Sequence, residues 1–176
     1  MKTKIWSLTT RISHWLLAIG FTVAYITGEN EWQMNYHYAF GALVGGILFF
    51  RILYGIIGPK YSNFKDFPMG VSKQIDFIKN YFSKNQTYVG HNPLASYVMI
   101  AMLIVTFLVI VTGILAFGIQ EGKGILAFLN DSYFKNMKLF KEIHVILANL
   151  LIALIVAHIS GVILDRFLHK KHQTLN

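Results

Sequence analysis

The 176-residue sequence has no cysteine and few charged side chains. Without cysteine the chain cannot form disulfides, thiolate zinc sites, iron–sulfur clusters or the covalent attachment of c-type haem. Any metal or haem must therefore be bound by His, Met or oxygen ligands. Charged residues make up 14% of the chain, against about 25% in soluble domains, and this deficit excludes an ordinary soluble enzyme.

The chain is rich in hydrophobic residues, and most of its charged residues are basic. Hydrophobic residues account for 55% of the chain, and 16 Lys and Arg against 8 Asp and Glu give a net charge of +8. A basic balance can indicate nucleic-acid binding, but a membrane protein with basic cytoplasmic loops explains the charge and the apolar excess together. We therefore expect a lipid environment and no nucleic-acid partner.

Four apolar stretches are long enough to cross a membrane, which requires about 20 residues in a helix. They cover roughly Thr9 to Gly28, His37 to Gly58, Leu94 to Gly118 and Glu142 to Leu168. The sequence thus predicts an all-α integral membrane four-helix bundle that forms one domain over residues 1–176. The first stretch is interrupted by Arg11 and His14 and lacks a small-residue cleavage site, so we expect a retained span, not a signal peptide.

The distribution of Lys and Arg predicts the orientation of these spans. Twelve of the sixteen lie on the side shared by both termini and the long loop between the second and third spans. The positive-inside rule then places both termini in the cytoplasm. On the other side, the loop from Ile119 to Lys141 is expected to be either an amphipathic segment lying on the membrane surface or an irregular loop.

Four histidines fall within the predicted spans or at their ends: His14, His37, His144 and His158. Ionisable groups at such depths are costly and usually face the bundle interior with a partner. The last two are 14 residues apart, which is about 21 Å of helix rise and places them within about 40° of one face. Chain direction alternates between spans, so depth pairs His14 with His158 inside and His37 with His144 outside.

Two facing imidazoles are the axial ligand set of a six-coordinate haem iron. Two pairs at separate depths therefore predict two non-covalent haems b, with the four histidines as iron ligands. Gly41 and Gly45 follow His37 at one-turn intervals and would leave room for a porphyrin. The same spacing also suits close helix–helix packing.

Two arginines are further candidates for haem binding. Arg11 lies three residues before His14 and near the same face, where it can bind a haem propionate or anchor the helix at the interface. Arg51 lies about 21 Å below His37 along the second helix, near the depth of the inner haem. Its alternative role is to reach lipid phosphate by snorkelling.

Other uses of the histidines fit the sequence less well. A zinc or copper site would need three or four ligands at one depth, whereas these histidines divide two and two. A proton pathway would normally use Asp or Glu inside the spans. The carboxylates nearest to the fourth span, Glu142 and Asp165, lie at its two ends.

Several segments resemble the bacterial cytochrome b561 family, which is related to the di-haem cytochrome b subunits of nickel–iron hydrogenases. They are RISHWLLA from Arg11, the stretch from His37 through FRILYGIIGPKYSNF, GHNP from Gly90 and IHVILANLLIALIVAHISGVI from Ile143. The resemblance implies four helices, two bis-His haems and the same four ligands. The chain departs from relatives at Ser7, where they often have Asp, and at Tyr54, where they often have Trp. The hydrogenase subunits are also usually longer, which favours a stand-alone member or an anchor for another redox protein.

These features predict a transmembrane di-haem cytochrome b that transfers electrons between the quinone pool and a redox protein in a respiratory chain. Haem with both axial positions occupied has no open site for oxygen, so quinone reacting at a haem edge is the expected chemistry. An alternative is a haem-bearing anchor subunit of a hydrogenase-like or other oxidoreductase complex. A third is a colourless transporter or scaffold whose histidines are structural.

Two further expectations concern His91 and assembly. His91 precedes the third span, where it can act in quinone binding or proton uptake, or belong to the turn and helix cap before Pro93. Four helices that enclose two haems leave a large lipid-facing surface on which a homodimer can form.

Overall fold

The chain is all-helical in the residues that the computed structural model describes, which are 7–59, 62–67, 93–131 and 138–168 with the single positions 70, 72, 75 and 79. The four long helices are α1 (Leu8–Thr27), α2 (Met34–Ile57), α4 (Pro93–Ile119) and α6 (Leu139–Leu168). Three short 3₁₀ turns accompany them: η1 (Glu31–Gln33), η2 (Phe64–Asp66) and η3 (Ala127–Leu129). The predicted all-α class is confirmed.

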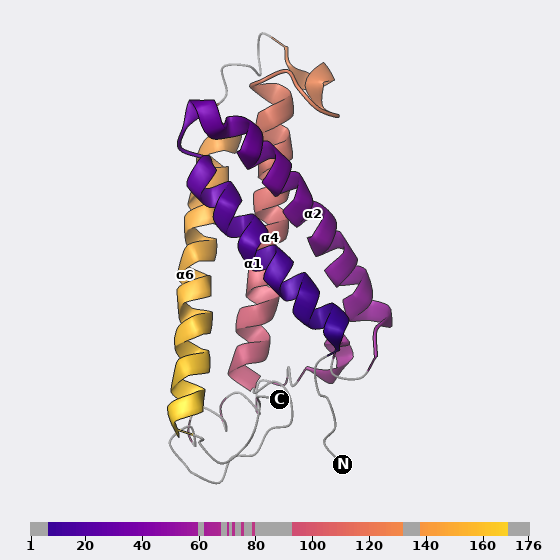
Figure 1. Cartoon of the computed structure of the whole chain (residues 1–176), viewed down its shortest axis with the longest axis vertical. Coiled ribbons are helices and arrows are strands. Elements are labelled where there is room, and N and C mark those ends of the chain that lie inside the picture. The colour runs from indigo at the N-terminus through magenta and orange to yellow at the C-terminus, as the bar shows by residue number, and fades with distance from the viewer. Residues whose placement is uncertain are drawn as a thin grey trace.

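The long helices pack mainly as two antiparallel pairs. α1 packs along α2, and α4 packs along α6. In Figure 1 the α1 and α2 pair runs diagonally across α4 and α6, which stand nearly upright. Since the chain reverses at each connection, α1 begins and α6 ends at the same end of the molecule.

Three of the four helical segments are long and apolar enough to cross a membrane. They are Glu31–Ile57, Leu94–Ile119 and Leu139–Phe167. α1 has 20 residues but is less apolar, because Arg11, His14 and several hydroxyl side chains interrupt its hydrophobic sequence. Its bounds nonetheless lie within one residue of the first predicted span.

Few large side chains are buried, as expected of helices whose outer faces meet lipid. A small apolar cluster lies between α4 and α6 and is centred on Val105, Val109 and Leu151. Phe21 of α1 packs against this cluster. Many large hydrophobic side chains of the long helices are exposed instead, for example Phe49 at 65% and Ile159 at 51%. Exposed apolar surface on this scale marks an interaction surface, here the lipid.

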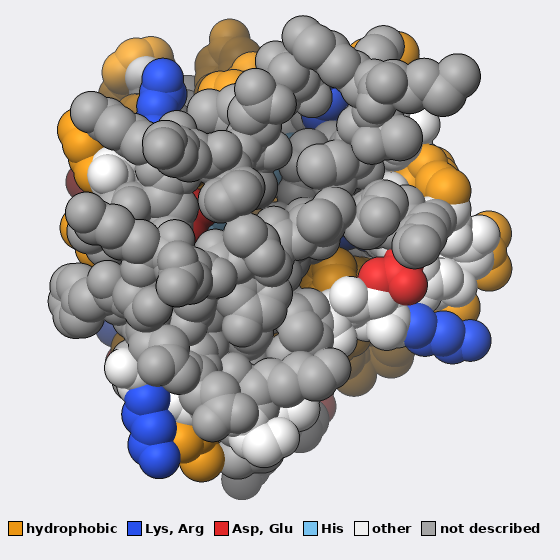
Figure 2. Space-filling view, turned by 90° about the horizontal axis from the view of Figure 1, so that it is seen from below, with side chains coloured by type: hydrophobic (Ala, Val, Ile, Leu, Met, Phe, Trp, Pro, Cys, Tyr) orange, Lys and Arg blue, Asp and Glu red, His pale blue; other side chains and the backbone are white. Residues whose placement is uncertain are grey.

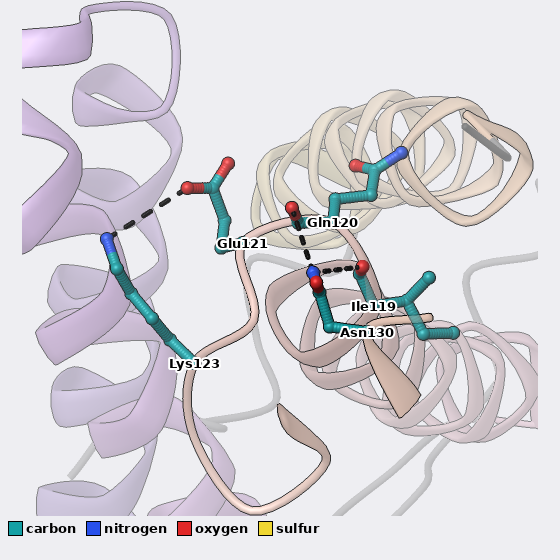
Figure 3. Close-up of polar contacts among 5 residues, drawn as sticks. All are labelled: Ile119, Gln120, Glu121, Lys123 and Asn130. Carbon is teal, nitrogen blue, oxygen red and sulfur yellow. Dashed lines mark hydrogen bonds and ion pairs between the residues drawn. The ribbon is translucent and has the colours of Figure 1, made fainter. Parts of the chain in front are cut away.

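The end of α4 is closed by a short irregular loop (Figure 3). The Asn130 amide donates to the carbonyl oxygens of Ile119 at 2.8 Å and Gln120 at 3.4 Å, satisfying acceptors that a helix end leaves free. Gly122 takes a positive φ of 62°, which glycine adopts without strain. Within the stretch 119–141, residues 120–131 are irregular, with η3 as their one helical turn, and residues 132–137 lie outside the described residues.

The end at which α1 begins and α6 ends carries Arg11, Lys65 and Arg166 among its described residues. Seen from that end, Lys and Arg side chains lie at the margin of the molecule and hydrophobic side chains lie on its flanks (Figure 2). Most of the lysines that predict the orientation lie outside the described residues, and so does His91.

Candidate functional site

The four histidines of the predicted spans meet in two pairs. The ring centres of His14 on α1 and His158 on α6 are 6.4 Å apart, and their planes make an angle of 51°. The ring centres of His37 on α2 and His144 on α6 are 5.9 Å apart, at 83°. α6 contributes one ring to each pair, and about 21 Å of helix rise separates the two rings. We call these the inner and the outer pair, after the sides that the sequence predicts.

Both separations fit two imidazoles bound to opposite faces of one haem iron. A bond from a metal to an imidazole nitrogen is about 2 Å long, so the centres of two axial rings lie about 6 Å apart. Within the described part of the chain, no group of three His, Asp or Glu side chains gathers as a metal cluster would require. The histidines thus suit an iron whose remaining ligands come from a porphyrin.

Hydrogen bonds to backbone carbonyls set the tautomer of the outer pair. Nδ1 of His37 lies 2.7 Å from the Ala24 oxygen, and Nδ1 of His144 lies 2.9 Å from the Val109 oxygen. A carbonyl oxygen only accepts, so each Nδ1 carries the proton and donates it. Nε2 of each ring is therefore left with the lone pair that a metal needs. Such outer contacts also fix the orientation of a ligating ring.

The inner pair lacks these contacts. Within the described residues, no hydrogen bond holds the ring of either His14 or His158. His14 is exposed, and its neighbour Trp15 meets it edge-on at a centroid distance of 5.8 Å. The positions of these two rings follow from where α1 and α6 place them.

Two glycines that the sequence analysis missed lie directly against the outer pair. A Cβ atom on Gly28 would lie 3.0 Å from Nδ1 of His37, and a Cβ on Gly113 would lie 3.0 Å from Cε1 of His144. A side chain at either position would press on the ring. The sequence contains one indication of this contact, which is Gly113 itself. Glycine in the middle of an apolar helix costs stability and often marks a place where another group comes close to the helix backbone.

The two glycines singled out from the sequence behave differently. A Cβ on Gly41 would meet nothing within 4 Å, so there is open space beside α2 one turn below His37. A Cβ on Gly45 would lie 3.5 Å from Ile110 of α4, an ordinary packing contact. Gly41 thus has open space beside it, while Gly45 packs against α4.

The two arginines lie in different surroundings. Arg51 is buried at 9% exposure, donates to the Ser62 carbonyl at 3.3 Å and lies 5.4 Å from the centre of the Phe64 ring. Its guanidinium therefore points beyond the end of α2 toward η2, and its partner there is protein. Arg11 is exposed, and its side chain makes no hydrogen bond within the described residues. It remains available to a propionate or to lipid phosphate.

Comparison with known proteins identifies the family. A family model described as prokaryotic cytochrome b561 matches residues 5–176. The chain belongs to the prokaryotic cytochrome b561 family. This cytochrome is therefore a b-type membrane protein of electron transfer whose helices contact lipid. No curated protein and no solved structure matches the chain.

Ser7 and Tyr54, at which the resemblance described above implies a departure from relatives, contact each other. The Ser7 hydroxyl lies 3.2 Å from the Tyr54 hydroxyl and also caps α1 by accepting from the Thr10 backbone nitrogen at 3.2 Å. Thr10 in turn shares a hydrogen bond of 3.0 Å with Ser62. These hydrogen bonds connect the start of α1 to the end of α2 and to Ser62, which follows it.

Proposed function

We propose that this protein is a transmembrane di-haem cytochrome b that transfers electrons between the quinone pool and a redox protein. Each haem b would be held by one histidine pair, the inner by His14 and His158 and the outer by His37 and His144. The observation that carries the proposal is that two pairs of rings face each other at the separation of axial ligands. Both pairs share α6, which would place the two haems at different depths.

Different residues of the chain would hold and orient the two haems. Haem supplies reversible uptake of one electron at iron without a change of axial ligands. The Ala24 and Val109 carbonyls orient the outer rings and raise their basicity as ligands. Leu151 lies midway between His144 and His158 on α6, is 2% exposed and packs with Val105 and Val109, and would keep water out of the space between the two pairs. Arg11, at the start of α1, would bind a propionate of the inner haem.

The membrane placement is part of the same proposal. We place all four long helices across the inner membrane as one bundle, with both termini in the cytoplasm, in accord with the positive-inside rule. α1 is the least apolar of the four, and its packing along α2 supports a shared transmembrane path. Its polar residues would then face neighbouring helices and haem rather than lipid.

The test is haem stoichiometry in the purified protein and in single histidine variants. The wild type should contain about two haems b per chain with a low-spin bis-His spectrum. His14→Ala and His158→Ala should each lose the inner haem, and His37→Ala and His144→Ala the outer one. His172→Ala, in the basic C-terminal tail, is the matched control and should keep both. A colourless wild type, or variants that lose haem without regard to these pairs, would contradict the proposal.

A further inference from the structure

A polar contact joins α1 to α6 between the two histidine pairs. The Tyr25 hydroxyl donates to Oδ1 of Asn149 at 3.0 Å, where the upper halves of α1 and α6 lie close together (Figure 1). Asn149 follows His144 by five residues, about 8 Å of helix rise toward the middle of the membrane. Tyr25 directly follows Ala24, whose carbonyl accepts from His37. The contact therefore lies beside the outer pair.

Both side chains of this contact are exposed, although they lie at membrane depth. Tyr25 is 37% exposed, and Asn149 is also exposed. An Asn amide has two N–H donors as well as its carbonyl acceptor, and Tyr25 uses only the carbonyl. Within the described residues, no hydrogen bond accepts from the Asn149 amide group. Water is scarce at this depth, so the flank between α1 and α6 presents a hydrogen-bond donor to the apolar phase.

The surroundings of the Asn149 amide limit the kinds of ligand that it can bind. Lipid phosphates and ester carbonyls lie at the membrane surface, whereas Asn149 lies well below the start of α6. The Phe21 ring lies beside Tyr25, with ring centres 5.9 Å apart, and gives the flank an aromatic wall. A ligand for this place is apolar, moves within the bilayer and carries a carbonyl acceptor.

We propose that Tyr25 and Asn149 form a binding site for the head group of a membrane quinone, which enters from lipid between α1 and α6. The Asn149 amide donates to one quinone carbonyl oxygen, Tyr25 holds the amide in that orientation, and Phe21 packs against the quinone ring. This inference rests on the proposed function, in which quinone is a redox substrate. It locates the quinone beside the outer pair, away from the membrane side of His91.

The experiment maps and measures quinone binding in the haem-loaded protein in lipid nanodiscs. A photoreactive azido-benzoquinone and an azido-naphthoquinone are cross-linked, and the labelled peptides are identified by mass spectrometry. Affinity comes from competition by decylubiquinone and by menadione. We expect labelling that can be competed away on α1 near Tyr25 and on α6 near Asn149, by the probe of the class that the protein uses.

Two variants and a control test the roles of the residues. Asn149→Leu keeps the approximate volume and removes the donor, and should weaken competitor binding about tenfold. Tyr25→Phe should weaken it about threefold, because the amide stays but loses its orientation. Tyr36→Phe removes an exposed hydroxyl at the start of α2 and should change nothing. Haem content is measured in every variant, so that a loss of fold is recognised.

The outcomes separate this site from the wider proposal. Competable labelling elsewhere, with Asn149→Leu binding as wild type, would overturn the site and leave quinone as the substrate. No competable labelling in a wild type that carries both haems would overturn quinone as the substrate as well. If Asn149→Leu loses haem, the labelling map of the wild type and the Tyr25→Phe affinity still decide.

Discussion

The inner and outer histidine pairs are alike in ring separation but differ in how the rings are held. His37 and His144 donate to backbone carbonyls and lie against Gly28 and Gly113. His14 and His158 make no such hydrogen bonds within the described residues, and their positions come from the helices alone. The outer rings are therefore oriented before haem binds, whereas the inner rings would be oriented by the haem itself.

The spacing of the histidine rings and their orientation are therefore separate properties of the chain. Spacing along α6 serves both pairs equally, since one helix carries a ring of each. Orientation depends on what the other helices bring to each ring, namely a carbonyl and a glycine for each outer ring. Contacts of this kind typically change metal affinity 10- to 100-fold, so the two sites should respond differently to changes around them.

The largest expected effect is at Gly113, where a branched side chain would fill the space of the His144 ring. Gly113→Val should remove most of the outer haem and leave the inner one, so haem content should fall from about two per chain toward one. The pyridine haemochrome assay, set against protein concentration, measures this. Gly46→Val is the matched control, because a Cβ on Gly46 meets nothing within 4 Å. Equal haem loss in the two variants would contradict the prediction.

A smaller change is expected at Gly28, which faces the other outer ring. Gly28→Ala adds one methyl group 3.0 Å from Nδ1 of His37, which would strain the hydrogen bond from that nitrogen to Ala24. The outer haem should bind about tenfold more weakly, while the inner haem is unchanged. The measurement is the rate of haem transfer to an apo-globin in excess. Unchanged transfer from the outer site would mean that the ring moves aside at no cost.

Thr112 offers a finer test of the outer pair. Its hydroxyl lies 3.2 Å from Nδ1 of His144 and shares that proton with the Val109 carbonyl. Thr112→Val keeps the shape and removes one acceptor, so the ring becomes a slightly weaker donor to ferric iron. The outer midpoint potential should rise by about 10–30 mV, while the inner potential stays constant. A redox titration followed optically measures both, and an equal shift of both haems would argue against a local effect.

The sequence predicts the helices and the histidine pairing well, for a physical reason. Both depend on distances along one chain direction, and helix rise converts the 14 residues between His144 and His158 into depth. The predicted start of the fourth span, Glu142, differs by three residues from the Leu139 start of α6. The role of these histidines as haem ligands remains a prediction.

What the sequence could not predict depends on how the helices are rotated against each other. Gly113 lies 31 residues before His144, and the Val109 carbonyl is a backbone atom that any residue would supply. The direction of Arg51 is likewise set by η2, which packs near the end of α2 and whose position no periodicity encodes. The contact between Tyr25 and Asn149 joins residues 124 positions apart. It arises only because α1 crosses α6.

The smallest expected effect concerns the inner pair, whose rings depend on helix placement. The hydrogen bond between Ser7 and Tyr54 holds the start of α1, and so His14, to the end of α2. Tyr54→Phe removes this hydrogen bond and leaves the α1 cap intact. The test uses a His144→Ala background, which should keep only the inner haem. In that background, Tyr54→Phe should speed up the transfer of the inner haem to apo-globin about two- to threefold. Tyr36→Phe in the same background should match its parent. The opposite result would be weaker binding of the outer haem, measured for Tyr54→Phe in a His158→Ala background, with unchanged binding of the inner haem. It would mean that the inner rings are not held by the position of α1 and that the contrast between the two pairs is wrong.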